Sequence, residues 1–447
     1  MNRRLRILLV QPAWDGLAYR RKIKVDERAI HPLSLGVVAA LSGDHEVRLV
    51  NEAQQALPPS AGGFDVVGIS VNTFNAPRAG RIADRYRAEH VPVVLGGPHT
   101  ALLPEECLRH ADAIVIGDAE DTWPQVLEDI QGRKLQPRYV STLQDGSLTP
   151  APRRELFHHN SRHVAFCQMS RGCSNQCRFC YLQYLPHRAL RLRDVNSIVL
   201  ELRSLPQQVI LFVDDNVFCQ PEYAREVFRA IAPLEKKWWI QAPTNLHRLE
   251  GLIEVMARGG CFSVSLGFQT ASQANTEAEH ILQNRVEEYG ELVRRLHRAG
   301  ILVDGTFIFG FDGDDPGTFE RTAELIASIN LDTYTFYFLT PYPGTEYFAQ
   351  FQREGRLLHE DWSRYDWDHV VVRPRHMTVA EVRAGVANLY RRLDRGYFCR
   401  HLVWQIPVHL RNLATPKLSG FLAATGWHYF RSPVQRENEA PSVPCRS

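Results

Sequence analysis

Short apolar runs alternate with segments of helical periodicity along most of the chain. In the first 140 residues the apolar runs predict strands at 7–10, 46–50, 66–71, 91–95 and 113–116. Apolar residues spaced three or four apart predict helices at 32–41, 78–90 and 122–130. Buried strands separated by helices are typical of a parallel sheet covered on both faces. The pattern therefore predicts a doubly wound α/β domain in residues 1–140.

A polar stretch rich in proline, serine and glycine at 136–152 predicts a linker, and the alternation resumes after it. The next strands are predicted at 163–169, 209–213, 238–242, 262–266, 302–309 and 335–339. Helices are predicted between them at 195–205, 222–232, 248–258, 286–299 and 318–329. These are six strand–helix units, whereas a closed barrel of this type has eight. We therefore expect an open, partial barrel in residues 153–345.

The remaining chain predicts a helical C-terminal cap in residues 346–431. A helix is expected at 379–395, with Thr378 as its N-cap and Glu381 as the partner in a capping box. Residues 402–430 mix aromatic and basic side chains, which fits a packed helix pair or a helix at a membrane surface. The polar tail 432–447 is predicted to be disordered.

Four aromatic residues of this cap lie close together in the sequence: Trp362, Tyr365, Trp367 and His369. Such a group either packs as part of an ordinary helical layer or closes over the barrel mouth and shapes a substrate pocket.

Composition argues against several classes of protein but does not identify a function. The chain has 447 residues, 44% hydrophobic and 23% charged, with a formal net charge of +2. This balance argues against nucleic acid as a partner. The basic start is followed by only four apolar residues, and no apolar run reaches a membrane span, so we expect a cytoplasmic protein. Nine cysteines are sparse for a disulfide framework.

Three of those cysteines form the densest chemical motif of the chain. Cys173, Cys177 and Cys180 are separated by three and then two residues. Thiolates at such spacing can bind one iron–sulfur cluster and leave its fourth iron open. A structural zinc site would need a second pair of ligands. Cys167 lies six residues upstream, but the alternation around it predicts a strand, in which it packs.

The sequence Cys-x-x-x-Cys-x-Phe-Cys resembles the signature of the radical S-adenosylmethionine (SAM) enzymes. The resemblance implies that Cys173, Cys177 and Cys180 bind a [4Fe–4S] cluster, whose fourth iron is chelated by SAM. It implies that Phe179 lies against the adenine of SAM. An electron from the cluster would then cleave SAM and yield the 5′-deoxyadenosyl radical.

The same resemblance assigns SAM contacts to the ends of the barrel strands, where barrel enzymes place their chemistry. Asp214, Asp215 and Asn216 occupy the place of the family's Gly-Gly-Glu motif, which accepts hydrogen bonds from the SAM ammonium; Asn216 is also a candidate N-cap. Gln269 stands where relatives often carry glutamate. The further candidate residues, in a stretch similar to the family's adenine-reading backbone, are Phe307, Ile308 and Gly310.

Small and polar residues also collect at the strand ends of the first domain, where ligands of open α/β sheets bind. Ahead of the cysteine motif they are similar to the Rossmann/flavodoxin-like cobalamin-binding domain of one radical SAM subfamily. The implied cobalamin contacts are Gln11, Pro12, Ser70, Asn72, Thr73, Gly96, Gly97, Pro98, His99, Gly117 and Asp118. Each glycine on its own is better explained as a turn residue, and only the set as a whole indicates a cobalamin site.

One departure from the cobalamin pattern concerns histidine. The motif Asp-x-His-x-x-Gly is absent after the first strand, and the loop Asp15–Tyr19 contains no histidine. Many members of this subfamily bind cobalamin without a histidine ligand. His31 and His99 are outside motif positions and are expected to be turn or cap residues.

The resemblance implies a cobalamin-dependent C-methyltransferase acting on a small biosynthetic intermediate, with flavodoxin or ferredoxin as electron donor. A cyclisation, rearrangement or oxidation with the same cofactors and no methyl transfer remains open. A third alternative is an iron–sulfur or cobalamin carrier without catalysis, although SAM-like strand ends argue against it. The pattern identifies neither the substrate nor the residue that quenches the radical.

Overall fold

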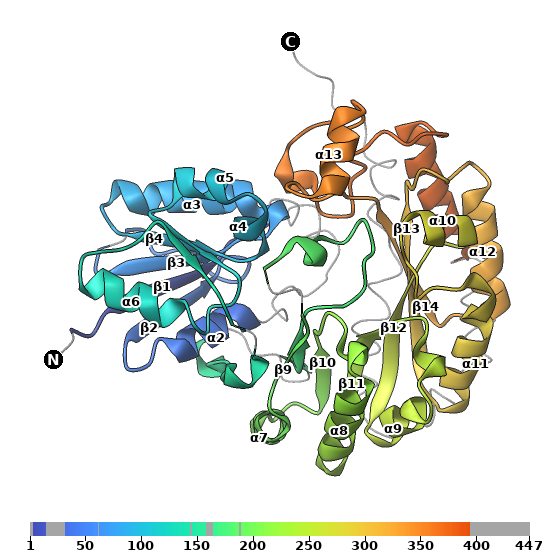
Figure 1. The fold of residues 1–447 in the computed structure, drawn as a ribbon, viewed down its shortest axis with the longest axis horizontal. Coiled ribbons are helices and arrows are strands. Elements are labelled where there is room, and N and C mark those ends of the chain that lie inside the picture. Colours follow the sequence, from blue (N-terminus) through green and yellow to red (C-terminus); the bar gives the residue numbers. More distant parts are fainter. Residues whose placement is uncertain are drawn as a thin grey trace.

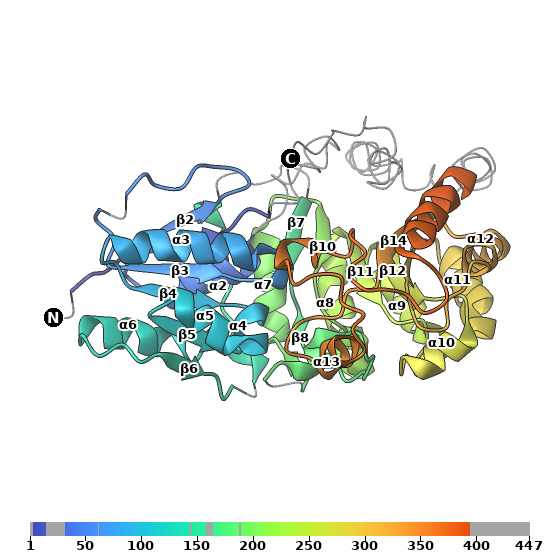
Figure 2. The same ribbon diagram turned by 90° about the horizontal axis from the view of Figure 1, so that it is seen from above.

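The protein consists of two parallel sheets whose carboxyl edges face each other, as seen in the computed structural model (Figure 1). The structure describes residues 3–14, 32–60, 62–143, 145–157, 164–186 and 189–393. The first sheet and its helices occupy the left of Figure 1, and the second sheet with its outer helices occupies the right. Figure 2 shows the same two units from above, joined across one side by the segment that carries α13 (Glu346–Arg353).

The first sheet has the strand order β2-β1-β3-β4-β5-β6, all parallel. Its strands are β1 (Arg6–Gln11), β2 (Glu46–Asn51), β3 (Val66–Ser70), β4 (Val93–Gly96), β5 (Ala113–Ile116) and β6 (Arg138–Val140). Its helices are α2 (Leu33–Leu41), α3 (Ala76–Ala88), α4 (Pro98–Leu102), α5 (Pro104–His110) and α6 (Trp123–Gln131). The order reverses between β1 and β3, which is the position where doubly wound sheets bind ligands.

Helices cover both faces of this sheet, as the sequence predicted. One buried cluster joins Leu8, Ile69 and Leu95 to α3 and α5, and a second joins Leu9 and Val66 to α2 and α6. Alternate residues of each strand point to opposite faces, so a strand covered on both sides must be apolar throughout. This explains why these strands read as continuous apolar runs.

The second sheet has the order β14-β13-β12-β11-β10-β7 and is also parallel. Its strands are β7 (Val164–Cys167), β10 (Val209–Phe212), β11 (Lys237–Ala242), β12 (Cys261–Gln269), β13 (Leu302–Phe309) and β14 (Thr333–Phe338). Its helices are α7 (Val195–Ser204), α8 (Pro221–Ile231), α9 (Leu252–Arg258), α10 (Gln273–Ala278), α11 (Tyr289–Arg298) and α12 (Thr318–Ile329). Within the described residues β7 and β14 are not paired, which confirms an open six-stranded barrel.

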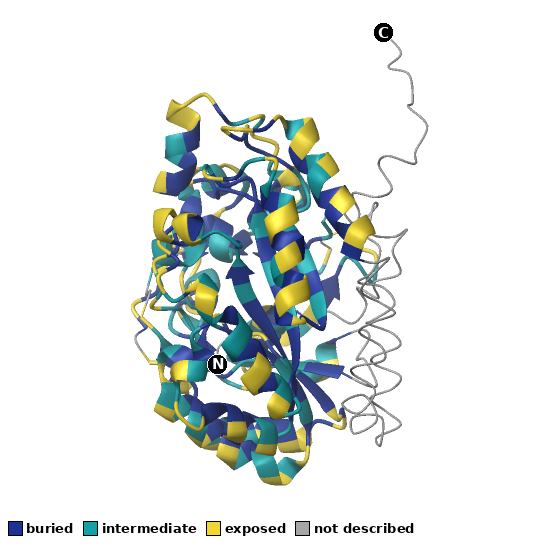
Figure 3. Ribbon diagram, turned by 90° about the vertical axis from the view of Figure 1, so that its right-hand side faces the viewer, coloured by how far each residue is buried: buried dark blue, intermediate teal, exposed yellow. Residues whose placement is uncertain are grey.

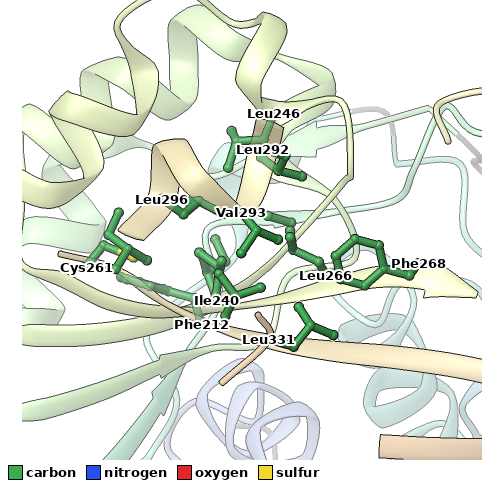
Figure 4. Packing of buried hydrophobic residues seen from close by; sticks show 14 of the residues in the cluster. Phe212, Ile240, Leu246, Cys261, Leu266, Phe268, Leu292, Val293, Leu296 and Leu331 are labelled. Carbon is green, nitrogen blue, oxygen red and sulfur yellow. The ribbon is translucent and has the colours of Figure 1, made fainter. Parts of the chain in front are cut away.

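The barrel core lies between the outer face of this sheet and its helices. Figure 4 shows Phe212, Ile240 and Leu266 from the strands against Leu292, Val293 and Leu296 from α11. The strands lie in dark blue behind helices whose outer sides are yellow in Figure 3. The opposite face of each strand carries half-buried residues, such as Asp304 and Thr306 on β13, and forms the inner wall of the barrel.

Several elements differ from the sequence prediction at the edges of the two units. β6 lies inside the expected linker and completes the first sheet. It is only three residues long, so no periodicity marks it. Residues 379–393 are helical, and the capping box is confirmed, because Thr378 N donates to Glu381 Oε2 at 2.7 Å and Glu381 N donates to Thr378 Oγ1 at 3.1 Å. The predictions for 402–430 and 432–447 lie outside the described residues.

The segment after β14 contacts the first unit as well as the barrel. Trp362 Nε1 donates to Glu106 Oε1 at 3.0 Å, and Trp14 Nε1 donates to Ser363 O at 3.4 Å. Trp362 also packs against Tyr365 and Phe348. This segment therefore holds the two units together on one side of the space between them.

Candidate active site between the two sheets

A cavity of about 410 Å³ lies between the carboxyl edges of the two sheets. The first-sheet edge, meaning the residues that follow β1, β3, β4 and β5, supplies Gln11, Ser70, Asn72, Gly96, Gly97, Pro98, Gly117 and Asp118. The barrel edge, meaning the residues that follow β7 and β10 together with the segment 181–193, supplies Gln168, Arg171, Tyr181, Arg191, Arg193, Val213 and Asp215. The volume lies within the usual range for small-molecule sites. The cavity thus brings together residues predicted for two different cofactors.

Three residues predicted to contact cobalamin do not line this cavity. Pro12 is buried, and Thr73 and His99 are 2% and 1% exposed. Thr73 Oγ1 and His99 Nδ1 lie 3.2 Å apart, and His99 Nε2 lies 3.4 Å from Glu106 Oε1. These side chains hold the loops that carry Asn72 and Pro98, in agreement with a supporting role for His99.

Glycines form part of the first-sheet edge of the cavity. Gly97 has a φ of 114°, and a Cβ placed on it would lie 2.7 Å from the carbonyl oxygen of Val71. Only glycine adopts this conformation without strain. The apolar side chains of Leu35, Val38 and Leu185 also line the cavity. A lining that combines glycines with apolar and polar side chains fits a cofactor that is itself partly apolar and partly polar, such as cobalamin.

The cysteine loop begins at a short ribbon beside the barrel edge. β8 (Ser170–Arg171) pairs antiparallel with β9 (Arg191–Leu192). Within the loop, Cys180 N donates to Cys177 O at 3.0 Å. Gln183 Nε2 donates to the carbonyls of Cys177 and Cys180 at 2.9 and 3.3 Å. The backbone between the second and third cysteine is therefore held in one turn.

Two side-chain amides point at the sulfur atoms of this loop. Asn216 Nδ2 lies 3.6 Å from Cys173 Sγ, and Gln283 Nε2 lies 3.6 Å from Cys177 Sγ. Burial raises the pKa of the Cys177 thiol, and it raises the pKa of Cys180 to about 12. A thiolate is stable at such a place only when it binds a cation, and amide donors stabilise iron-bound sulfur. The donor set therefore fits an iron–sulfur cluster.

A site for a single metal ion has a different ligand geometry from that of an iron–sulfur cluster. Among the described residues, no three His, Cys, Asp or Glu side chains converge on one point that could hold a metal ion. In a cuboidal cluster each thiolate binds a different iron, so its ligands surround the cluster instead of meeting at one ion.

The adjacent Asp214 and Asp215 point in different directions. Asp214 is 2% exposed and accepts hydrogen bonds from Met169 N at 3.0 Å and from Ser170 Oγ at 2.7 Å. Burial raises the pKa of Asp214 to about 7. Its carboxylate thus holds the start of the cysteine loop. Asp215 lines the cavity and accepts from Gly172 N at 2.8 Å with one oxygen.

Asn216 and Gln269 place amide groups at the barrel edge. Asn216 is 7% exposed, and its Oδ1 has no hydrogen-bond partner within the described chain. An unpaired buried acceptor beside Cys173 fits a cationic ligand such as the SAM ammonium. Gln269 has a φ of 65° at a β-bulge between β12 and β13. Strained backbone of this kind is concentrated at functional sites.

The remaining SAM candidates lie around the end of β13. The Phe307 side chain is fully buried on the outer face and stacks on Phe268, so only its backbone faces the barrel interior. Ile308 points to the opposite side and packs in the cluster that includes Phe179. Gly310 N donates to Asp314 Oδ2 at 2.8 Å, which fixes the turn after the strand.

An ion-pair network across the cavity was not predicted. Arg171 lies 3.0 Å from Asp118 and 2.8 Å from Glu120, and Arg191 lies 2.6 Å from Asp118. Asp118 and Glu120 belong to the first-sheet edge, whereas Arg171 is two residues before Cys173. The pairs are separated by more than 50 residues in sequence, so no local pattern signals them; the position of Arg171 beside the cysteine motif was the available hint.

Comparison with known families agrees with this arrangement of two units. Residues 167–326 match the Radical SAM superfamily, and residues 26–127 match the B12 binding domain. The first match contains the three cysteines and β10 to β13, and the second contains β2 to β5.

Two curated relatives extend the similarity over most of the chain. A bacteriochlorophyllide d C-12(1)-methyltransferase of Chlorobaculum tepidum is 29% identical over 404 residues, covering 87% of this chain and 87% of the relative. An anaerobic magnesium-protoporphyrin IX monomethyl ester cyclase of Cereibacter sphaeroides is 27% identical, covering 74% of this chain and 60% of the relative.

A solved structure has the same fold. The cobalamin-dependent S-adenosylmethionine radical enzyme OxsB, with aqua-cobalamin bound, matches with a TM-score of 0.66. The match covers 98% of this chain and 80% of the other at 12% sequence identity. At this identity the likeness concerns the fold, and it confirms the predicted order of a doubly wound domain followed by an open barrel.

Proposed function

We propose that this chain, which contains a radical SAM domain and a B12-binding domain, methylates a carbon atom of a small biosynthetic intermediate. The observation that carries the proposal is the shared cavity. Asp118 of the B12-binding domain and Arg171 and Asp215 of the barrel line the same space. A methyl donor and a radical source must reach one substrate carbon, and this cavity lies between their two domains.

In this proposal the cluster and cobalamin bind at separate sites on the chain. Cys173, Cys177 and Cys180 would hold the [4Fe–4S] cluster, and the glycine-lined first-sheet edge would hold cobalamin. When bound, the cluster supplies the electron that turns SAM into methionine and the 5′-deoxyadenosyl radical, and cobalamin supplies the methyl group. The protein's own residues bind, orient and shield these groups.

The SAM contacts in this proposal divide between amides and a carboxylate. The unpaired Oδ1 of Asn216 and the second oxygen of Asp215 are available to the SAM ammonium. Gln269 stands at the β12 bulge, where its side-chain amide can donate and accept hydrogen bonds. Phe179, packed at 5.9 Å from Phe311, offers an apolar wall for the adenine.

Asp214 has a positioning role in this scheme. Its hydrogen bonds to Met169 and Ser170 orient the strand that enters the cysteine loop. The SAM contact proposed for the pair of aspartates therefore falls on Asp215.

The test is anaerobic turnover with SAM carrying a deuterated methyl group. The reconstituted protein is supplied with a chemical reductant and a pool of candidate intermediates, and products are analysed by mass spectrometry. Methyl transfer predicts a product heavier by the labelled methyl group. The matched control is Cys177→Ala, which should yield neither labelled product nor 5′-deoxyadenosine. Unlabelled product formed together with 5′-deoxyadenosine would contradict methyl transfer.

That last outcome would favour the second candidate, a cyclisation, rearrangement or oxidation. The similarity to a cyclase named above is the observation in its favour. A carrier without catalysis predicts that no 5′-deoxyadenosine forms at all, even with reductant and an intact cluster.

The structure says little about the electron donor and the cellular compartment. None of the described helices is long and apolar enough to cross a membrane. Flavodoxin or ferredoxin as electron donor, and the cytoplasm as compartment, stay predictions of the sequence.

A further inference from the structure

We propose that the interior of the barrel binds the ammonium group of an elongated amine substrate, with Asp304 as its anionic partner. The inference rests on the proposed function, because it names a class of substrate for that reaction. The site is a row of polar side chains across four neighbouring strands, called the polar row below. It consists of Gln241, Ser265, Asp304 and Thr333.

The polar row follows from the register of the strands. Ser265 on β12 pairs with Gln241 on β11 and with Asp304 on β13. Asp304 in turn pairs with Thr333 on β14. Its chain neighbour Val303 belongs to the core that packs against the helices, so Asp304 points to the opposite side, into the barrel. Residues paired in register share a face of the sheet, and the four side chains therefore lie at one level of the inner wall.

Hydroxyl groups of the row hold both oxygens of the Asp304 carboxylate. Ser265 Oγ donates to Asp304 Oδ2 at 2.8 Å, and Thr333 Oγ1 donates to Asp304 Oδ1 at 2.8 Å. A carboxylate oxygen accepts more than one hydrogen bond, and each hydroxyl oxygen keeps lone pairs of its own. The row therefore still offers acceptors to the three N–H donors of an ammonium group.

The charge of Asp304 is not balanced within the described chain. No arginine, lysine or histidine side chain of the described residues pairs with it, and its charged neighbour is a second carboxyl, that of Asp332. Burial raises the pKa of Asp304, and Asp332 adds to the rise. Glu201, by contrast, is paired with both Arg154 and Arg193. A carboxylate held without a cation is costly, so a ligand that supplies one gains the energy that the protein has left unused.

Solvent reaches the polar row, so a ligand can reach it too. Gln241 is exposed, and Asp304 and Thr333 are half-buried. Thr306, the next inward-facing residue of β13 toward the mouth, is also half-buried. The row thus borders open space inside the barrel instead of a packed core.

The other strands present apolar side chains to the same interior. Leu211 and Trp239 pack with Val164, Val209 and Phe262 in a cluster separate from the helix-facing core. Along β10 these residues alternate with residues of the helix-facing core, so they lie on the inner face. A ligand inside the barrel therefore meets a polar wall on one side and an apolar wall on the other, which fits an amine on an apolar skeleton.

The depth of the row sets the length of the ligand. Asp304 lies four residues before Ile308 on β13, and Ile308 packs in the cluster that includes Phe179 of the cysteine loop. At about 3.3 Å per residue, the two levels are about 13 Å apart. An amine bound at Asp304 would therefore bring a carbon about 13 Å away to the level of the cysteine loop.

The test compares three probes of one chain length: octylamine, which is cationic at neutral pH, neutral 1-octanol and anionic octanoate. Each is measured by equilibrium dialysis with the anaerobically loaded full-length protein. The parent protein should bind octylamine at least about tenfold more tightly than 1-octanol, and octanoate most weakly. Asp304→Asn should weaken octylamine binding about tenfold or more and leave 1-octanol binding within about twofold, because the charge is lost while the shape is kept.

Two controls separate a ligand site from a structural carboxyl. Asp304→Asn removes an unbalanced charge, so its Tm, iron content and cobalamin content should be no lower than those of the parent protein. Asp315→Asn is the matched variant, since Asp315 is an exposed carboxylate paired with Arg321 outside the barrel interior. It should leave the affinity for all three probes unchanged.

The inference is overturned if the parent protein binds octylamine no better than 1-octanol, a result that does not depend on any variant. It is also overturned if Asp304→Asn weakens both probes equally or unfolds earlier than the parent protein. Its failure is distinct from that of the proposed function. Labelled methyl transfer to a substrate without an amine would refute the ammonium site and keep methyl transfer. Asp304-dependent octylamine binding without any labelled product would keep the ammonium site and refute methyl transfer.

Discussion

The first-sheet edge and the barrel edge have the same strand arrangement but are lined by different kinds of residue. Both are carboxyl ends of a parallel six-stranded sheet. The first-sheet edge offers glycines, such as Gly97, and small polar residues. The barrel edge offers buried, hydrogen-bonded side chains such as Asp214 and Asn216 around a constrained cysteine loop.

The difference reflects the size of what each edge must hold. A large macrocycle is bound by clearing space for it, so a side chain is harmful there. A cluster and a small cation are bound by orienting individual donors and acceptors, so lost side chains are harmful there. Substitutions that add atoms should therefore damage the first-sheet edge, and substitutions that remove atoms should damage the barrel edge.

The largest expected effect comes from removing one thiolate at the barrel edge. Cys177→Ala should abolish the cluster, because two thiolates cannot replace three, and 5′-deoxyadenosine formation should fall to background. The measurements are iron content and the visible spectrum after anaerobic reconstitution. Cys261→Ala is the control, since this buried thiol lies at the start of β12, away from the loop. Cobalamin binding should survive in Cys177→Ala, and its loss would mean that the edges are not separable.

The next effect comes from adding one methyl group at the first-sheet edge. Gly97→Ala costs about 1–2 kcal/mol in backbone strain and also brings Cβ within 2.7 Å of Val71 O. Cobalamin affinity should fall about tenfold or more, while iron content and 5′-deoxyadenosine formation persist. Gly43→Ala adds a methyl group at another positive-φ glycine, with a φ of 55° and nothing within 4 Å of the added Cβ, and controls for a substitution away from the cavity. Equal cobalamin binding by the two variants would contradict a role for Gly97 at the cavity.

A smaller effect is expected where the two edges touch. Arg171→Ala leaves Asp118 and Glu120 without this partner; breaking a fully buried ion pair costs about 3–5 kcal/mol, and the cost is smaller here because the Arg171 side chain is 22% exposed. Cobalamin should bind about three- to tenfold more weakly at unchanged iron content. Arg138→Ala, which breaks an exposed pair with Glu105, is the control. If Arg171→Ala instead lost iron and kept its cobalamin affinity, the network would serve only the cysteine loop.

The last expected effect is a pH dependence of stability that arises in the barrel domain, at the end of α10. Glu279 is 3% exposed, its Oε2 has no partner within the described chain, and burial raises its pKa to about 7. A carboxyl whose pKa is raised on folding binds its proton more tightly in the folded state. Stability should therefore fall as pH rises from about 4.5 to 7, by at most about 1.4 kcal/mol per pH unit.

Glu279→Gln removes this titration and should flatten the fall. The measurement is the Tm of both proteins across that pH range. Glu105→Gln, at an exposed helix position of the first domain, should leave the slope unchanged. A parent protein whose Tm rises over this range relative to Glu279→Gln would show an ionised Glu279 in the folded state.

Local patterns predicted the elements that are long or strongly periodic. The strand Leu302–Phe309 and the helix Thr318–Ile329 lie where their apolar spacing predicted them. The three-residue β6 and the short α4 were not predicted, because they span less than the windows in which periodicity is detectable. Helix starts shifted where 3-10 turns precede them, as at Val286–Glu288 before α11.

The sequence predicted that the candidate site lies at the strand ends. It did not predict which side chains there face the cavity and which hold the backbone. Asp214 and Asp215 are neighbours with the same side chain, yet one holds backbone and the other lines the cavity. Thr73 and His99 were among the predicted cobalamin contacts, but their side chains are buried in the protein. Which way a side chain turns depends on partners far away in the sequence, such as Arg171 for Asp118.

The amino-acid sequence by itself determined the two parallel α/β units, their order and the three-cysteine motif, because periodicity and residue spacing are local properties. Only the tertiary structure decided that the two carboxyl edges face one cavity, that Arg171 joins them, and that Trp367 packs beside Phe74 of the first domain. Those are contacts between residues tens to hundreds of positions apart. They form because burial of the whole chain leaves few ways to pair charges and pack rings.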